Sequence, residues 1–218
     1  MPIFTYSFVI ITVIITIITF RDRQLFNSMS FHVRPIQSDG QVYRIISSMF
    51  LHVNTPHIVF NMFSFYSFAL YMEMQFGHST ILLITIVSGV AGNLLALLLN
   101  KNNPEYRAVG ASGAVSGVIF ASIFLLPGGS VFVFPIPIPI PSWLFAILFI
   151  LISIYGIGRG VGNIGHEAHL GGALAGIALA VAFQPAIIHQ QPLLLAALTI
   201  PVILFILYFS QASQSNKS

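Results

Sequence analysis

Seven apolar runs, each close to the length of a membrane-spanning helix, dominate this sequence. They cover residues 2–20, 56–76, 79–99, 110–126, 142–157, 168–189 and 192–210, the fourth and fifth being short. A helix needs about 20 apolar residues to cross the hydrocarbon of a bilayer. Of the 218 residues, 56% are apolar and 6% are charged, whereas about 25% are charged in a soluble domain. We therefore expect an all-α membrane protein, a six-helix transmembrane bundle with a seventh C-terminal span.

No flexible or charged linker interrupts the apolar pattern, which favours one membrane domain over residues 1–218. Its six-span core is expected over about 1–189, and the additional span over about 192–210. The first run lacks a basic leader and a small-residue cleavage site, so we expect a retained span rather than a signal peptide. Pro201 predicts a kink in the last span.

Two connections carry their own patterns. The connection after the first span, about 35 residues long, mixes charged residues with Phe and Met, which is typical of an interfacial, partly helical element. The sequence PIPIPIP at 135–141 lacks alternate backbone donors and therefore predicts a connector rather than a helix.

Charge and cysteine content exclude several classes of function. The eight Lys and Arg are scattered singly, so no basic stripe is available for nucleic acid. The chain has no Cys, which excludes disulfides and thiolate chemistry. No metal or cofactor site is predicted, and the expected partners are lipid and transmembrane proteins. We expect a multi-pass protein of the cell membrane of a prokaryote.

Four polar residues fall near the starts of even-numbered spans. His57 and Asn61 lie in the second span, Ser112 in the fourth and His169 in the sixth. Even spans enter from one face, so the four side chains are expected on the same side of the bilayer at similar depth. Polar groups in the membrane are costly and usually functional.

Ser112 lies in the small-residue sequence GASGAVSG at 110–117. At a helix start the first N–H groups are unpaired and the dipole is positive, so backbone amides beside this serine could bind a developing oxyanion. The alternative is helix packing alone, because Gly113 and Gly117 form a small-xxx-small face.

His169 lies in GHEAHLGGALAG at 165–176, where Gly172 and Gly176 allow another helix to approach closely. An imidazole brought to Ser112 would be the base that a serine nucleophile requires. The alternative is a structural histidine.

His57 and Asn61 are spaced i, i+4 and both can donate toward an oxyanion, although they could equally join helices by a hydrogen bond. No Asp follows residue 39. A Ser-His dyad is therefore expected rather than a triad, and it avoids burying a carboxylate at a cost of about 2.5 kcal/mol or more.

Taken together, GASG at 110–113, AHLGG at 168–172 with Gly176, and His57-xxx-Asn61 resemble the rhomboid family of intramembrane serine proteases. EMQFG at 73–77 and the Tyr43-Arg44 pair are similar to further motifs of that family. The resemblance implies Ser112 as nucleophile, His169 as base, and His57, Asn61 and the Ser112 amide as oxyanion site. It also implies cleavage of single-pass proteins at or near their membrane segments, with the fifth span as a gate.

Two departures from the family pattern stand out. Tyr43 replaces the usual Trp, and Ser116 stands where many members have an aromatic residue that packs on the catalytic histidine. A serine cannot stack on an imidazole, so other residues must hold His169.

Two alternatives to the serine protease are considered. One is a zinc protease, but His166 and His169 are spaced i, i+3 rather than the i, i+4 of such enzymes. The other is a catalytically inert rhomboid-like protein that binds membrane clients. With the family topology and the N-terminus inside, the Lys and Arg would all fall on the outer face, against the positive-inside rule.

Overall fold

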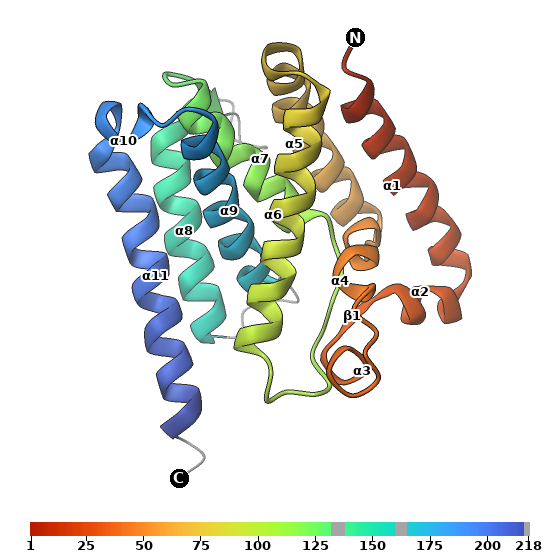
Figure 1. Ribbon diagram of the computed structural model, residues 1–218. Coiled ribbons are helices and arrows are strands. Elements are labelled where there is room, and N and C mark those ends of the chain that lie inside the picture. The colour runs from red at the N-terminus through yellow and green to blue at the C-terminus, as the bar shows by residue number, and fades with distance from the viewer. Residues whose placement is uncertain (132–137, 160–164, 216–218) are drawn as a thin grey trace.

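The computed structural model describes residues 1–131, 138–159 and 165–215. Seven long helices form the bundle, and each expected apolar run forms one of them (Figure 1). They are α1 (Ile3–Arg21), α5 (Thr55–Phe76), α6 (His78–Leu99), α7 (Ser112–Leu125), α8 (Ser142–Arg159), α9 (His166–Phe183) and α11 (Pro192–Ser215). The predicted six-plus-one helical bundle is confirmed. The sixth span is shorter than expected, because residues 187–190 form a separate short helix, α10 (Ile187–Gln190).

By length and composition, four of the described helices can cross a membrane, namely α1, α6, α9 and the 192–209 part of α11. α7 and the 142–157 part of α8 are shorter apolar helices. The chain ends lie at opposite ends of the bundle, as seven crossings require (Figure 1). The protein is thus a multi-pass integral membrane protein. α11 runs through Pro201 as one helix.

The long connection between α1 and α5 is partly helical, as predicted. It contains α2 (Arg23–Met29), β1 (Phe31–His32), α3 (Val33–Ser38), α4 (Arg44–Ser47) and the 3-10 turn η1 (Ser48–Phe50). β1 pairs antiparallel with β2 (Arg107–Ala108), which joins this connection to the loop before α7.

A second short ladder lies at the other end of the bundle. β3 (Ser130–Val131) pairs with β4 (Ile140–Pro141) directly before α8. Residues 135–137 of the expected PIPIPIP connector lie outside the described residues, and 138–141 are not helical.

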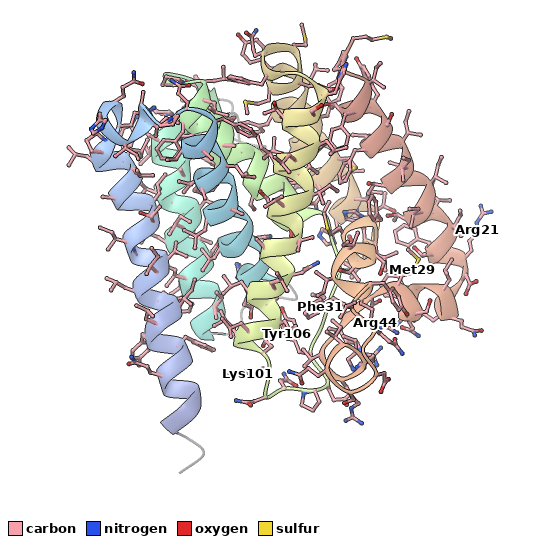
Figure 2. All side chains as sticks on the ribbon, viewed as in Figure 1. Arg21, Met29, Phe31, Arg44, Lys101 and Tyr106 are labelled. Carbon is pink, nitrogen blue, oxygen red and sulfur yellow. The ribbon has the colours of Figure 1, made fainter. Side chains whose placement is uncertain are left out.

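Arg44 anchors the connection after α1. Its side chain is 7% exposed and its Nη1 donates to the carbonyl oxygens of Asn27 at 2.7 Å and Ser30 at 2.8 Å. Figure 2 shows Arg44 beside Met29 and Phe31 in this compact segment. A hydrogen bond from Gly110 N to Ser48 O, at 3.0 Å, joins the η1 segment to the loop before α7. The start of α7 is therefore fixed from outside the bundle.

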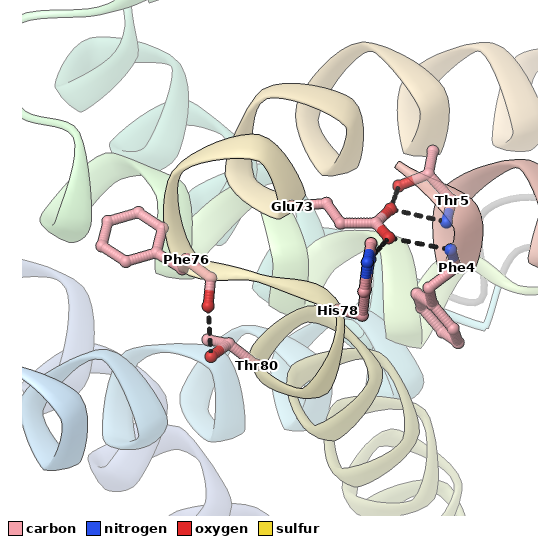
Figure 3. A network of polar contacts seen from close by, with 6 residues as sticks. All are labelled: Phe4, Thr5, Glu73, Phe76, His78 and Thr80. Carbon is pink, nitrogen blue, oxygen red and sulfur yellow. Dashed lines mark hydrogen bonds and ion pairs between the residues drawn. The ribbon is translucent and has the colours of Figure 1, made fainter. Parts of the chain in front are cut away.

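Glu73 ties the end of α5 to the start of α1. Its carboxylate accepts hydrogen bonds from the backbone N–H groups of Phe4 at 2.8 Å and Thr5 at 2.7 Å, from the Thr5 hydroxyl, and contacts His78 (Figure 3). The first N–H groups of a helix have no partner within it, and the positive end of the dipole favours an anion. The acidic residue predicted as a motif thus caps a neighbouring helix.

The centre of the bundle is built by α6, α7 and α9, whose backbones approach one another at glycines. A β-carbon placed on Gly172 would lie 2.0 Å from Gly113 O, and one on Gly176 would lie 2.1 Å from Gly117 O. Only glycine fits at such contacts. The close approach predicted from the two small-xxx-small sequences is therefore what joins α7 to α9.

Candidate active site

Ser112 is the first residue of α7 and is partly exposed among buried neighbours. The hydrogen bond from Val115 N to Ala111 O, at 2.9 Å, opens the helical ladder. The N–H groups of Ser112 and Gly113 come before this bond, so no carbonyl of the helix pairs with them. The serine hydroxyl therefore stands beside backbone donors at the positive end of a helix.

His169 lies in the first turn of α9, and the residues next to it touch the residues next to Ser112. A β-carbon on Gly113 would lie 3.1 Å from Ala168 O. The structure contains no hydrogen bond between the Ser112 hydroxyl and the His169 ring. Catalytic hydrogen bonds are often looser in a free enzyme and tighten with substrate. The predicted pair is thus placed on adjoining residues of two packed helices.

His57 lies in the first turn of α5, where its N–H donates to the Asn54 side chain at 2.9 Å. Its ring faces Gly110. A β-carbon on Gly110 would lie 3.0 Å from His57 Cε1, 3.1 Å from His57 Nε2 and 3.9 Å from the backbone N of Ser112. The φ of Gly110 is +136°, which side chains disfavour. One imidazole nitrogen and one backbone amide therefore converge on the same glycine.

Asn61 is buried one turn further along α5. Its Nδ2 donates to the His57 carbonyl oxygen at 3.0 Å, within the same helix. An amide carries two N–H groups, so one remains for a ligand. Asn61 therefore lies on the predicted face of α5, but part of its donor capacity is used by its own helix.

An aromatic residue of α8 contacts His169. The ring centroids of Phe149 and His169 are 5.4 Å apart, with the planes tilted by 33°. Ser116, at the position where an aromatic was missing, donates to Ser112 O at 2.8 Å and so serves its own helix. Sequence reasoning missed Phe149, because one Phe in an apolar run carries no signal of its partner.

Two residues of the zinc alternative, Glu167 and His166, have partners of their own. The Glu167 carboxylate accepts hydrogen bonds from Asn100 and the Tyr106 hydroxyl, each at 3.2 Å. The His166 ring lies against Gly156 of α8. In the described part of the chain, no three His, Asp or Glu side chains are grouped as a metal site requires.

Comparison with known proteins shows what this chain is similar to. A family profile, the Rhomboid domain, matches residues 39–186. Rhomboid protease GluP of Bacillus subtilis is 27% identical over 183 residues, which is 83% of this chain and 34% of that protein. RHOMBOID-like protein 6, mitochondrial, of Arabidopsis thaliana is 33% identical over 148 residues, 67% of this chain and 45% of that protein. Rhomboid-like protease 3 of Toxoplasma gondii is 32% identical over 145 residues, 66% of this chain and 53% of that protein.

The chain thus spans about a third to a half of the length of these relatives, which come from both bacteria and eukaryotes. The family profile covers more than half of the chain, including α5 to α9 and the four predicted site residues. By sequence and by its helical bundle, this chain belongs to the rhomboid family.

Proposed function

We propose that this protein is an intramembrane serine endopeptidase that uses a dyad of Ser112 and His169. The observation that carries the proposal is the convergence of three helix starts. The first turns of α5, α7 and α9 carry His57, Ser112 and His169, and Gly110 and Gly113 on either side of the serine lie next to the His57 ring and Ala168 O. Family membership and relatives named as rhomboid proteases support protease activity.

In the proposed reaction, Ser112 Oγ attacks the carbonyl carbon of a substrate peptide bond while His169 takes its proton. The oxyanion is stabilised by the Ser112 N–H and the side-chain N–H groups of His57 and Asn61. His169 then protonates the leaving amine. Water, deprotonated by His169, hydrolyses the acyl ester and restores the Ser112 hydroxyl.

The proposed substrates are single-pass transmembrane proteins, cut at or near the membrane segment. A substrate helix hides its peptide bonds in internal hydrogen bonds, so it must unwind locally before Ser112 can attack. Residues that disfavour helix, such as Gly and Pro, are therefore expected close to the cut. A prokaryotic cell membrane remains our prediction for the location.

The test uses purified full-length protein in liposomes with a transmembrane substrate. Ser112→Ala and His169→Ala are expected to abolish cleavage, and Asn61→Ala to lower kcat about 100-fold, as for the loss of one oxyanion donor. Melting temperatures in detergent control for folding. Undiminished cleavage by Ser112→Ala would disprove the proposal.

The same assay distinguishes the proposed protease from the alternative, an inert protein that binds membrane clients. If the folded wild type cleaves no substrate and Ser112 does not react with a fluorophosphonate probe, the inert alternative is favoured. Loss of cleavage on adding a chelator would instead point to metal chemistry.

A further inference from the structure

His52, just before α5, is a buried histidine with no role in the proposed reaction. It has 0% exposure and follows the η1 turn. Its Nδ1 lies 3.1 Å from Oγ1 of Thr16, a buried threonine in the middle of α1. A buried imidazole bound to a second helix is costly to desolvate, so it requires a structural or functional reason.

The hydrogen bonds of Thr16 determine which nitrogen of His52 carries the proton. Thr16 Oγ1 also lies 3.0 Å from the carbonyl oxygen of Phe50 and donates to it, since a carbonyl can only accept. A hydroxyl has one proton, so toward His52 the threonine oxygen must accept. His52 is therefore the neutral tautomer with the proton on Nδ1 and a lone pair on Nε2.

The His52 ring packs edge-to-face on the ring of His57, with centroids 4.9 Å apart and planes at 73°. Nε2 of His52 and Nδ1 of His57 are both buried, and neither has a hydrogen-bond partner among the described residues. No hydrogen bond from Nδ1 therefore orients the His57 ring. It is held between the His52 ring and Gly110, which lies next to its Nε2.

We propose that His52 is a positioning residue for the oxyanion site: anchored to α1 by Thr16, it limits rotation of the His57 ring beside Gly110, at the start of α7. The inference rests on the proposed function of His57 as an oxyanion donor. Cε1 and Nε2 of His57 both lie beside Gly110, and a rotation of the ring by 180° would exchange their places. The N–H donor would then point to a different place, and Cε1 cannot replace it. Thr16 and His52 limit this rotation without touching substrate.

The chain offers a matched pair of variants to test this. Thr16→Val removes the hydroxyl that binds His52 and keeps the shape. Thr12→Val makes the same change one turn away, at an equally buried threonine whose hydroxyl has no partner among the described residues. We expect Thr16→Val to lower kcat about tenfold at unchanged KM, less than the loss from removing an oxyanion donor. Thr16→Ser should retain kcat, and Thr12→Val should leave it unchanged.

A second measurement does not depend on cleavage. Nitrogen-15 NMR of the histidine rings in detergent micelles should show His52 with its proton on Nδ1 in the wild type and in Thr12→Val. In Thr16→Val the ring signals of both His52 and His57 should shift. If Thr16→Val does not fold, His52→Phe, which keeps a ring but loses the bond to Thr16, takes its place in the kinetics, and the NMR measurement then follows the His57 signals alone.

The two measurements separate the failure of this inference from that of the proposed function. Cleavage that persists in Ser112→Ala rejects the protease mechanism. The NMR measurement then tests only whether Thr16 and His52 hold the His57 ring. Cleavage that requires Ser112 but is equal in Thr16→Val and Thr12→Val overturns the positioning role. Unchanged His57 signals in Thr16→Val overturn it as well, whatever the kinetics show.

Discussion

Two interfaces of α9, those with α7 and with α8, are built by different means. Toward α7, glycines bring backbone against backbone, with Gly172 over Gly113 and Gly176 over Gly117. Toward α8, rings fill the space, as Phe149 packs on His169 at 5.4 Å. A backbone contact cannot adapt without moving a whole helix, whereas a side-chain contact can change by rotation about χ angles.

The two kinds of contact have different roles at the candidate site. The glycine interface sets the distance between the helices that carry Ser112 and His169, and it should be stiff. The ring interface sets the orientation of His169 and belongs to α8, the helix expected to move as a gate. Trp143 lies in the first turn of α8, whereas Phe149, which contacts His169, lies near the middle of that helix.

The largest effect is expected from Gly172→Ala. The new β-carbon would lie 2.0 Å from Gly113 O, so α7 and α9 must separate, and we expect a loss of about 3 kcal/mol of unfolding free energy together with cleavage. Denaturation in mixed micelles measures it. Gly129→Ala is the control, because its β-carbon has no neighbour closer than 3.7 Å, and it should change stability by less than about 0.5 kcal/mol. Equal effects of the two variants would show that the interface is not stiff.

Phe149→Leu should separate activity from stability. Loss of the ring frees His169 to turn, and we expect kcat to fall about tenfold while the melting temperature changes little. Phe145→Leu is the matched control, because Phe145 is another partly buried ring of α8 that packs on Phe149 at 5.8 Å. If Phe145→Leu lowers kcat as much, the effect comes from α8 packing in general and not from contact with His169.

Gly156→Ala tests a glycine of α8 that faces α9. Its β-carbon would lie 2.3 Å from Nε2 of the His166 ring, which can rotate away, so the loss should be only about 1 kcal/mol. Adding His166→Ala should restore stability in the double variant, and a double-mutant cycle in detergent measures the coupling. If Gly156→Ala lost as much unfolding free energy as Gly172→Ala, the interface with α8 would be as stiff as the interface with α7.

The smallest effect concerns pH. Burial lowers the pKa of the His52 imidazole from 6.5 to about 3. His52 stays neutral in the fold but takes up a proton when unfolded, so its contribution is complete above pH 6.5 and is lost progressively as pH falls toward 3. The denaturation midpoint should fall less between pH 7 and pH 5 in His52→Phe than in the wild type. A pH dependence identical to that of the wild type would contradict the assignment.

Much of this molecule was predictable because lipid leaves few choices. Backbone groups in hydrocarbon must pair within a helix, so the apolar runs determined the seven helices. Span parity predicted that His57, Ser112 and His169 lie on the same side of the bilayer, and the glycine spacing predicted the close approach of α7 and α9. These inferences use only local periodicity, which a single sequence contains.

Other features depended on contacts between residues far apart in the chain. The sequence showed that Ser116 cannot stack on His169 and that His52 precedes α5, but not that Phe149 comes from α8 or that Thr16 of α1 binds His52. Nor did it show that Glu73 caps α1. The sequence determined which helices form and predicted which residues are candidates for the chemistry, since both follow from local pattern. Only the tertiary structure showed which side chains contact each of those residues, because these contacts depend on how the helices are rotated against one another.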